Sequence, residues 1–313
     1  MAISIILIIV GMALVLWGAD RLTDGAVAIA QRMNVPEIVI GLTIVAMGTS
    51  MPEFCVSFAG ALKGTSDLAV GNVLGSNIFN AMLIVGVAAM VAPMSILKST
   101  VKKDIPFAVF ASLILFQLCL NNRITRIEAF VLLIMFAVFM IYTVMGAKNG
   151  MPTASEKEAK KNKSKGLSKD VFYVVAGLAA LIVGSNIFVD NATEIARLLG
   201  VSEAVIGLTI VAAGTSLPEL ATSIVAARKG QSAIAIGNVI GSNVFNILFI
   251  IGLTGVITPM QIVGLTNIDF AVMLGSMLLL WLMSFTKYTL SRWEGAVLAV
   301  LYVVYVGWLI YNV

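Results

Sequence analysis

The feature that most constrains this chain is a carboxylate that directly follows an apolar run long enough to lie inside a lipid bilayer. Residues 41–53 read GLTIVAMGTSMPE, which places Glu53 at the end of an uncharged segment. An ionisable side chain at that depth is costly unless something pairs with it, and so it marks a functional site by default. Pro52 has no N–H to donate to the carbonyl of Gly48, and its ring pushes the helix apart. The sequence therefore predicts a broken transmembrane helix.

The predicted break should expose oxygen atoms. We expect the carbonyls of Ala46, Met47 and Gly48 to lose their partners within the helix, next to the hydroxyls of Thr49 and Ser50. Irregular backbone persists at membrane depth only where it is buried in protein or lines a cavity. Carbonyls, hydroxyls and a carboxylate together are the ligands of a hard cation. The alternative is a glutamate that a neighbouring hydroxyl satisfies as part of a helix contact.

The same segment occurs twice. Residues 207–219 read GLTIVAAGTSLPE, so Glu219 matches Glu53, and the separation of these two positions along the chain defines the repeat offset. At this offset, 29 of the 49 residues in 38–86 are identical to those in 204–252. Two copies with the same surroundings argue against an incidental glutamate. We divide the chain into a first copy at 1–147, an inserted segment at 148–166 and a second copy at 167–313.

The composition is that of a polytopic membrane protein: 60% of residues are hydrophobic, 12% are charged, and the mean hydropathy is +1.03. Each copy is predicted to hold five spans. An odd number makes the second copy enter from the opposite face, so the fold class is all-α, with ten transmembrane helices as two inverted five-helix repeats. The predicted spans are 3–20, 36–61, 68–91, 105–121, 126–146, 170–189, 203–227, 233–256, 268–285 and 293–311.

Basic residues set the expected orientation. The segment 148–166 is rich in lysine, and 16 of the 20 Lys and Arg residues fall on its side of the predicted membrane. This linker is therefore expected in the cytoplasm with both termini outside, in a cell inner (plasma) membrane. The asymmetry also accounts for the net charge of +4, so lipid is an expected partner and nucleic acid is not. Acidic residues at predicted span ends, such as Asp20, Asp24 and Asp190, are expected to be solvated or interfacial.

A second motif is also duplicated. Residues 71–80 read GNVLGSNIFN and residues 237–246 read GNVIGSNVFN. At helical spacing the first copy places Asn72, Ser76 and Asn80 on one stripe. We favour cation ligation for four residues of the motif: Ser76, Asn80, Ser242 and Asn246. Ligation and plain helix packing are equally supported for another four: Asn72, Asn77, Asn238 and Asn243. The chain has no histidine, which disfavours a transition metal.

With these motifs the chain resembles the cation/calcium exchanger superfamily, whose two α-repeats carry Gly-Thr-Ser-x-Pro-Glu and Gly-Asn-x-x-Gly-Ser-Asn-x-x-Asn/Asp. The resemblance covers essentially the whole chain. It implies antiport of Na⁺ and Ca²⁺ by alternating access, in which tilted helices slide over a fixed bundle. It also implies a monomer with no enzymatic activity and no cofactor other than the transported ions.

The resemblance further implies a ligand set. Glu53 and Glu219 correspond to the central Ca²⁺ ligands, and Asn80 and Asn246 to a central polar pair. The remaining implied ligands of sodium or calcium are the hydroxyls of Thr49, Ser50, Ser76, Thr215, Ser216 and Ser242 and the backbone carbonyls of Ala46 and Ala212.

One position departs from the family pattern. Members often carry Asp at the last position of the second copy, where this chain has Asn246. The fixed central charge is then −2, from Glu53 and Glu219. The number of sodium ions and the coupling ion stay open, and exchange of Ca²⁺ or another divalent cation for H⁺ is the main alternative. A cation channel and an intramembrane enzyme that uses the two glutamates as an acid–base pair are alternatives from other classes.

Overall fold

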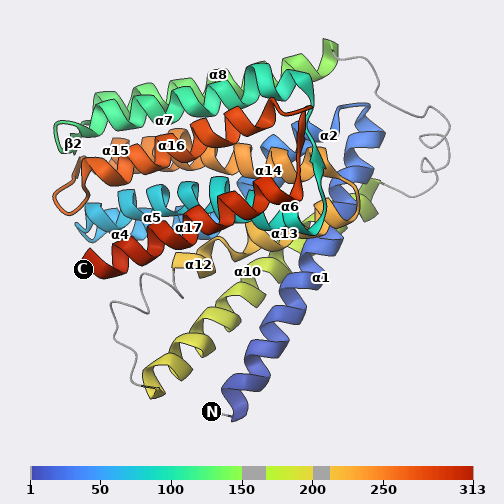
Figure 1. Ribbon diagram of the computed structural model, residues 1–313, viewed down its shortest axis with the longest axis horizontal. Helices are drawn as coiled ribbons and strands as arrows, with labels where there is room; N and C mark the ends of the chain where they lie inside the picture. The colour runs from blue at the N-terminus through green and yellow to red at the C-terminus, as the bar shows by residue number, and fades with distance from the viewer. Residues whose placement is uncertain (1, 150–166, 200–211, 313) are drawn as a thin grey trace.

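The computed structural model describes residues 2–149, 167–199 and 212–312, and nearly all of them are helical (Figure 1). The predicted linker therefore lies outside the described residues from 150 onwards, as does the start of the second broken helix. The elements of the first copy are α1 Ala2–Met33, α2 Glu37–Ile40, η1 Gly41–Val45, α3 Ala46–Thr49, α4 Met51–Leu62, α5 Ser66–Ile78, η2 Phe79–Ile84, α6 Val85–Val91, β1 Met94–Ser95, η3 Thr100–Asp104, α7 Ile105–Cys119, β2 Arg123–Ile124 and α8 Arg126–Asn149.

The described elements of the second copy follow the same order, except that no counterpart of η3 precedes α16. They are α10 Leu167–Leu198, α12 Ala212–Thr215, α13 Leu217–Arg228, α14 Ser232–Val244, η5 Phe245–Ile250, α15 Ile251–Ile257, β3 Met260–Gln261, α16 Asn267–Ser284, β4 Thr289–Leu290 and α17 Arg292–Asn312. The η elements are π-helical turns within longer helices, so α5, η2 and α6 form one continuous rod, as do α14, η5 and α15.

Two small ladders join the copies. Strand β1 pairs antiparallel with β4, and β2 pairs antiparallel with β3. The repeat offset takes β1 onto β3 and β2 onto β4, so each ladder holds one strand from each copy. This exchange is what a two-fold relation between inverted copies produces.

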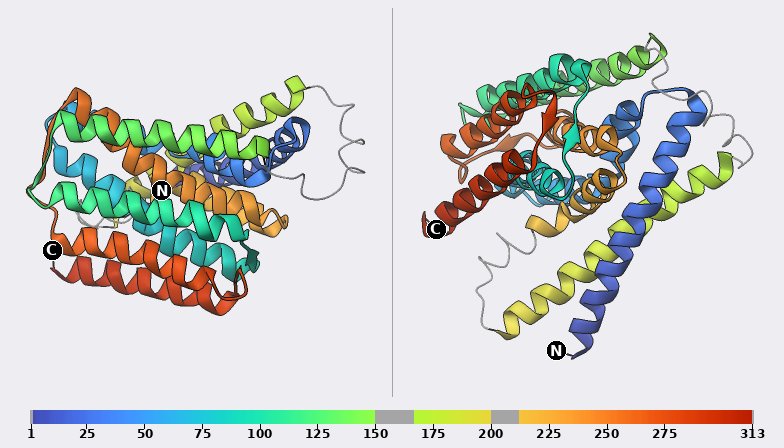
Figure 2. Two further views of the ribbon diagram at one scale, coloured as in Figure 1. Left: turned by 90° about the horizontal axis from the view of Figure 1, so that it is seen from above. Right: turned by 45° about the vertical axis from the view of Figure 1, so that its right-hand side comes forward.

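Helices α1 and α10 form a crossed pair that projects from the block made by the other helices (Figures 1 and 2). Glycines let the two backbones touch. A Cβ atom on Gly18 would lie 2.7 Å from the carbonyl oxygen of Gly177, and one on Gly11 would lie 2.8 Å from that of Gly184. Small residues are the usual means of close helix approach in membranes, where lipid provides no hydrophobic drive for association.

Helix α1 is longer than the sequence suggested. The predicted first span ended at residue 20, but α1 continues to Met33. The reason is that Asp20 and Asp24 do not end the helix. Their charges are met by basic side chains, with Arg21 Nη2 2.7 Å and Lys229 Nζ 2.6 Å from Asp20. Both aspartates therefore lie within α1 and are not simply solvated at a span end.

Seven helices of the described residues are long and apolar enough to cross a membrane, or eight if the bent pair 37–49 and 51–62 is one span. The helix axis bends by 48° between the two halves of that pair. The count of ten spans stays a prediction. Two of the predicted spans are not among these helices because the described helical segment is too short. Helix α7 has only 15 residues, and the helix before Glu219 is described only from Ala212.

We expect the α1–α10 contact to be sensitive to a single methyl group. Gly18→Ala forces the two backbones apart, since overpacking of this kind costs about 1–3 kcal/mol. The melting temperature of the purified protein in detergent should fall accordingly. The matched control is Gly307→Ala in α17, where an added Cβ meets nothing within 4 Å. Equal melting temperatures for the two variants would contradict the packing argument.

Candidate cation-binding site

Both broken helices turn at a serine. Ser50 (φ −82°, ψ 9°) and Ser216 (φ −90°, ψ 9°) leave the helical region in the same way. Pro52 and Pro218 follow in the first turn of α4 and α13, where a missing N–H costs that helix no hydrogen bond. Each glutamate then also lies in a first helical turn, where the helix dipole favours negative charge.

The two glutamates are buried and tied to each other's copy. Glu53 is 1% exposed and Glu219 is fully buried. The hydroxyl of Ser50 donates to Oε1 of Glu219 at 2.8 Å, and the hydroxyl of Ser216 donates to Oε1 of Glu53 at 2.8 Å. Because each serine reaches the glutamate of the other copy, the two breaks meet inside the protein. Ser216 Oγ also lies 3.2 Å from Ser76 Oγ, which brings α5 to the same place.

Four asparagines form a second set of contacts between the copies. The side-chain amide of Asn80 donates to Oδ1 of Asn243 at 3.0 Å, and that of Asn246 donates to Oδ1 of Asn77 at 3.1 Å. Asn77 and Asn243 in turn donate to each other's backbone carbonyl at 3.5 and 3.3 Å. The amide nitrogens of Asn80 and Asn246 are engaged in these bonds, which turns their side-chain oxygens away from the same partners and leaves those oxygens available as acceptors.

Four acceptor oxygens are left over at this position. Within the described residues, the buried atoms Glu53 Oε2, Glu219 Oε2, Asn80 Oδ1 and Asn246 Oδ1 have no hydrogen-bond partner. A buried polar group without a partner costs about 1–3 kcal/mol, and more if it is charged. The repeat offset relates these atoms in pairs, Glu53 with Glu219 and Asn80 with Asn246. A set of acceptors with two carboxylates and no donor suits a hard cation such as Na⁺ or Ca²⁺.

Asn72 and Asn238, whose role the sequence left open, support the glutamates from behind. Asn72 donates to the carbonyl of Glu53 at 3.1 Å, and Asn238 donates to the carbonyl of Glu219 at 3.3 Å. Each also binds a hydroxyl from the same half-helix as the glutamate, Ser57 at 2.9 Å or Ser223 at 3.0 Å. These contacts fix the backbone that carries the two acids.

Among the remaining predicted ligands, the expectation for Ala46 needs a correction. We expected the helix break to free the carbonyl of Ala46, and this is wrong. It accepts the N–H of Ser50 at 3.0 Å, because helical bonding continues up to Ser50, and the hydroxyl of Ser242 lies 3.4 Å away. Thr49 is buried, and its hydroxyl lies 3.1 Å from Oδ1 of Asn238. In the second copy, Ala212 and Thr215 are the first and last residues of α12.

Two kinds of feature escaped the sequence. Asn80 and Asn246 lie within the π-helical turns η2 and η5, which are frequent at functional sites and widen the helix locally. No composition signal distinguishes them from α-helix. The hydroxyl of Ser185 in α10 donates to the carbonyl of Gly214 at 2.6 Å, the carbonyl that Pro218 leaves without its helical partner. Only the distance between α10 and the break decides that contact.

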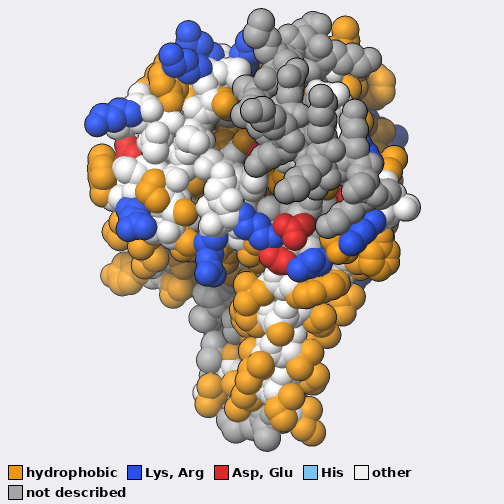
Figure 3. All heavy atoms as spheres, turned by 90° about the vertical axis from the view of Figure 1, so that its right-hand side faces the viewer, with side chains coloured by type: hydrophobic (Ala, Val, Ile, Leu, Met, Phe, Trp, Pro, Cys, Tyr) orange, Lys and Arg blue, Asp and Glu red, His pale blue; other side chains and the backbone are white. Residues whose placement is uncertain are grey.

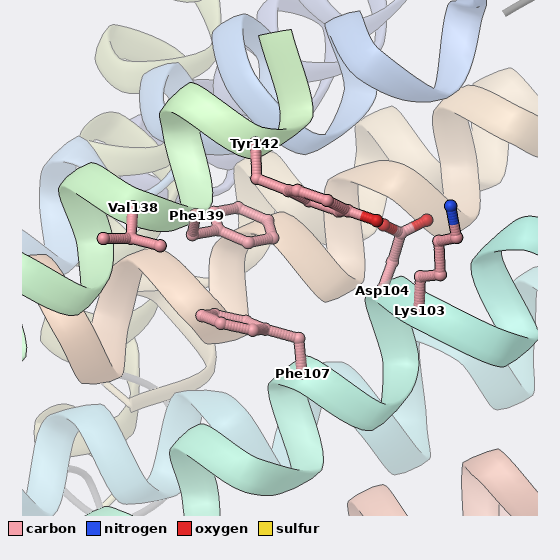
Figure 4. Close-up of a pocket in the computed structure, with 6 residues that line it drawn as sticks. All are labelled: Lys103, Asp104, Phe107, Val138, Phe139 and Tyr142. Carbon is pink, nitrogen blue, oxygen red and sulfur yellow. The ribbon is translucent and has the colours of Figure 1, made fainter. Parts of the chain in front are cut away.

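A surface pocket of about 350 Å³ lies elsewhere, between α7 and α8 (Figure 4). Its walls are mainly aromatic and aliphatic, with one acid and one lysine at the rim. Its lining residues are Lys103, Asp104, Phe107, Val138, Phe139 and Tyr142. It contains none of the paired glutamates, serines or asparagines, so it is separate from the candidate cation site.

Comparison with known proteins agrees with this geometry. The chain is 38% identical to the putative antiporter CaxA of Alkalimonas amylolytica over 312 residues, which cover 97% of this chain and 98% of that protein. It is 34% identical to the sodium/calcium exchanger MaX1 of Methanosarcina acetivorans over 346 residues, with 99% of both chains covered. Its fold matches the sodium-calcium exchanger NCX_Mj in a structure soaked with Na⁺ and Ca²⁺, with a TM-score of 0.85, 30% identity, and coverage of 97% and 98% of the two chains.

The family model described as sodium/calcium exchanger protein matches twice, at residues 3–145 and 169–311. Each match falls within one of the two copies related by the repeat offset, and together they span nearly the whole chain. The resemblance drawn from the two motifs is thereby confirmed. This chain is a membrane protein that belongs to the sodium/calcium exchanger protein family.

Proposed function

We propose that this protein exchanges Ca²⁺ for Na⁺ across the membrane by alternating access. The observation that carries the proposal is the group of four buried acceptor oxygens without partners, on Glu53, Glu219, Asn80 and Asn246. Two of them belong to carboxylates, and each pair joins the two copies. A relative named as a sodium/calcium exchanger and the match to NCX_Mj support the same choice of ions.

Charge explains why such a site would exchange ions instead of leaking them. A single Ca²⁺ neutralises the two carboxylates, and Ca²⁺ takes six to eight oxygen ligands. Two or more Na⁺ ions could neutralise the same pair by occupying neighbouring oxygens. A neutral loaded site can be occluded within the apolar interior, whereas occluding a bare site of charge −2 is too costly. The carrier then switches only when it is loaded, which is antiport.

The inverted copies supply the two states. Because two nearly equivalent halves surround one central site, exchanging their conformations opens the site first to one face and then to the other. The crossed pair α1 and α10 is the part that we expect to move, since it projects from the block and meets the rest mainly at the broken helices (Figure 2). We further propose a monomer in the plasma membrane, with the linker in the cytoplasm and both termini outside.

Exchange of Ca²⁺ for H⁺ is the second candidate. The specific observation in its favour is that Asn80 and Asn246 are both neutral, which leaves only two fixed charges for the counter-ion to meet. Each buried carboxylate retains one oxygen without a partner, and that atom can bind a proton as well as a metal ion.

The first test removes one central charge at a time. Glu53→Gln or Glu219→Gln should reduce ⁴⁵Ca²⁺ uptake into proteoliposomes by about 100-fold or more, because half of the charge that binds Ca²⁺ is lost at a buried site. Glu128→Gln is the matched control. Its carboxylate accepts the N–H of Thr125 at 2.8 Å at the start of α8, and glutamine can take that place. Uptake like that of the wild type in both central variants would refute the proposal.

The coupling ion is tested with gradients. Vesicles loaded with Na⁺ and diluted into Na⁺-free buffer at equal pH should drive ⁴⁵Ca²⁺ uptake, and a pH gradient alone should not. The opposite result would replace the Na⁺/Ca²⁺ assignment by H⁺/Ca²⁺ exchange. Uptake that continues with no counter-ion inside would indicate a channel.

Asn246→Asp tests the position at which this chain departs from the family pattern. Aspartate adds a third central carboxylate and loses the amide that donates to Asn77, so we expect an altered Na⁺ dependence or a new sensitivity to pH. Asn80→Asp is the matched variant, because Asn80 makes the equivalent contact to Asn243. If initial rates at varied Na⁺ and pH match the wild type in both variants, the two positions lie outside the ion path.

A further inference from the structure

An ion-pair cluster joins α1 to the end of the second broken helix. Lys229 directly follows α13, and its Nζ lies 2.6 Å from a carboxylate oxygen of Asp20 and 2.6 Å from one of Asp24. It also donates to the backbone carbonyl of Asp20 at 3.1 Å, and Arg21 pairs with Asp20 at 2.7 Å. These side chains are 28–44% exposed. Exposed ion pairs contribute little each, so this contact holds two helices together yet can open.

The cluster lies toward the face at which α10 begins, which we call the linker face because α10 follows the inserted segment in the sequence. Gly25, one residue after Asp24, packs on the carbonyl of Asp170 near the start of α10, and Arg32 pairs with the Asp170 carboxylate at 2.8 Å. Figure 3 shows this face, with acidic side chains among basic ones where the projecting helices meet the block.

The internal repeat supplies a counterpart in the opposite half. The repeat offset places Lys63 after α4 as Lys229 follows α13, and the next residues, Gly64 and Gly230, share a left-handed backbone with φ of +78° and +75°. Asp190 of α10 likewise corresponds to Asp24 of α1.

The two halves nevertheless differ in their contacts. Lys63 and Asp190 are both exposed, and within the described part of the chain neither forms an ion pair. Equivalent residues are thus paired at one face and apart at the other. The α1–α10 pair therefore sits closer to one broken helix than to the other, as the more extensive packing of α1 on α13 also indicates.

We propose that these residues form two alternate latches that position the α1–α10 pair during exchange. The linker-side latch is Lys229 with Asp20 and Asp24, and it holds the linker face shut. The far-side latch is Lys63 with Asp190, and it forms only after α1 and α10 have moved and the opposite face has shut. This inference rests on the proposed alternating access, in which the second state is the first with the roles of the copies exchanged.

The two latches are unequal. The linker-side latch gives its lysine two carboxylates, whereas the far-side latch offers one, because Asn186 stands at the position that corresponds to Asp20. The empty protein should therefore favour the state that is closed at the linker face. Removing either latch should shift the population, in opposite directions, which a purely structural role for these side chains would not do.

Spin-label distances can test this in the absence of transported ions. Nitroxides at the exposed residues Met33 of α1 and Leu97 of the loop after β1 report the position of α1 against the block, in a background with Cys55 and Cys119 replaced by alanine. In Na⁺-free and Ca²⁺-free nanodiscs, Lys229→Gln should raise the ratio of the minor to the major distance by about three- to tenfold. Asp190→Asn should lower the same ratio.

Two further variants separate the latch from general effects. Arg228→Gln removes the neighbouring positive charge, which forms no ion pair among the described residues, and should leave the ratio unchanged. The charge exchange Lys229→Asp with Asp24→Lys should restore the ratio of the wild type. Equal effects of Lys229→Gln and Arg228→Gln, or shifts in the same direction for Lys229→Gln and Asp190→Asn, would overturn the proposal. The distance measurements do not depend on flux. If the distances shift as expected in a protein that shows no ⁴⁵Ca²⁺ uptake in proteoliposomes, the proposed function is refuted and the latches stand.

Discussion

The structure depends on keeping two carboxylates buried without a basic side chain beside them. Glu53 and Glu219 accept hydrogen bonds from serine hydroxyls and lie in the first turns of their helices. Among the described residues, neither forms an ion pair with a lysine or arginine. Dipoles of this kind offset only part of the cost of a buried charge. In the proposed exchange, the rest comes from a bound cation that can leave again. A resident lysine would satisfy the acids permanently and abolish exchange, so the absence of an internal counter-charge in the described part of the chain is what makes transport chemically reasonable.

The internal repeat meets this constraint with few kinds of residue. Each broken helix holds one glutamate and has a serine at its turn. With two copies crossed, each serine reaches the glutamate of the other, and each central asparagine is held by an asparagine of the other. These donors are used in contacts between the copies, and four buried acceptor oxygens, on Glu53, Glu219, Asn80 and Asn246, have no partner among the described residues. The same duplication gives equivalent lysines at the two faces, of which only Lys229 is paired among the described residues in this state.

Much of this was predictable from the sequence. The repeat, the paired acids and the second motif identified the central residues, because chemistry at membrane depth leaves few alternatives for a carboxylate beside a proline. The errors came from local geometry. Ala46 keeps its helical hydrogen bond because the chain does not turn until Ser50. Helix α1 runs past Asp20 and Asp24 because the basic side chains of Arg21 and Lys229 neutralise them. The π-helical turns at Asn80 and Asn246 left no mark in the composition.

The sequence by itself determined that the chain is a membrane protein of two matched copies with a glutamate in each, since hydropathy, proline and repetition are properties of the chain alone. Only the tertiary structure decided which atoms are donors to which. Asn77 and Asn243 became supports, Asn80 and Asn246 kept free oxygens, and Lys229 found partners that Lys63 did not. Those outcomes depend on how far apart two helices of different copies lie. A periodicity specifies which face of a helix is polar, but it does not specify what stands opposite that face.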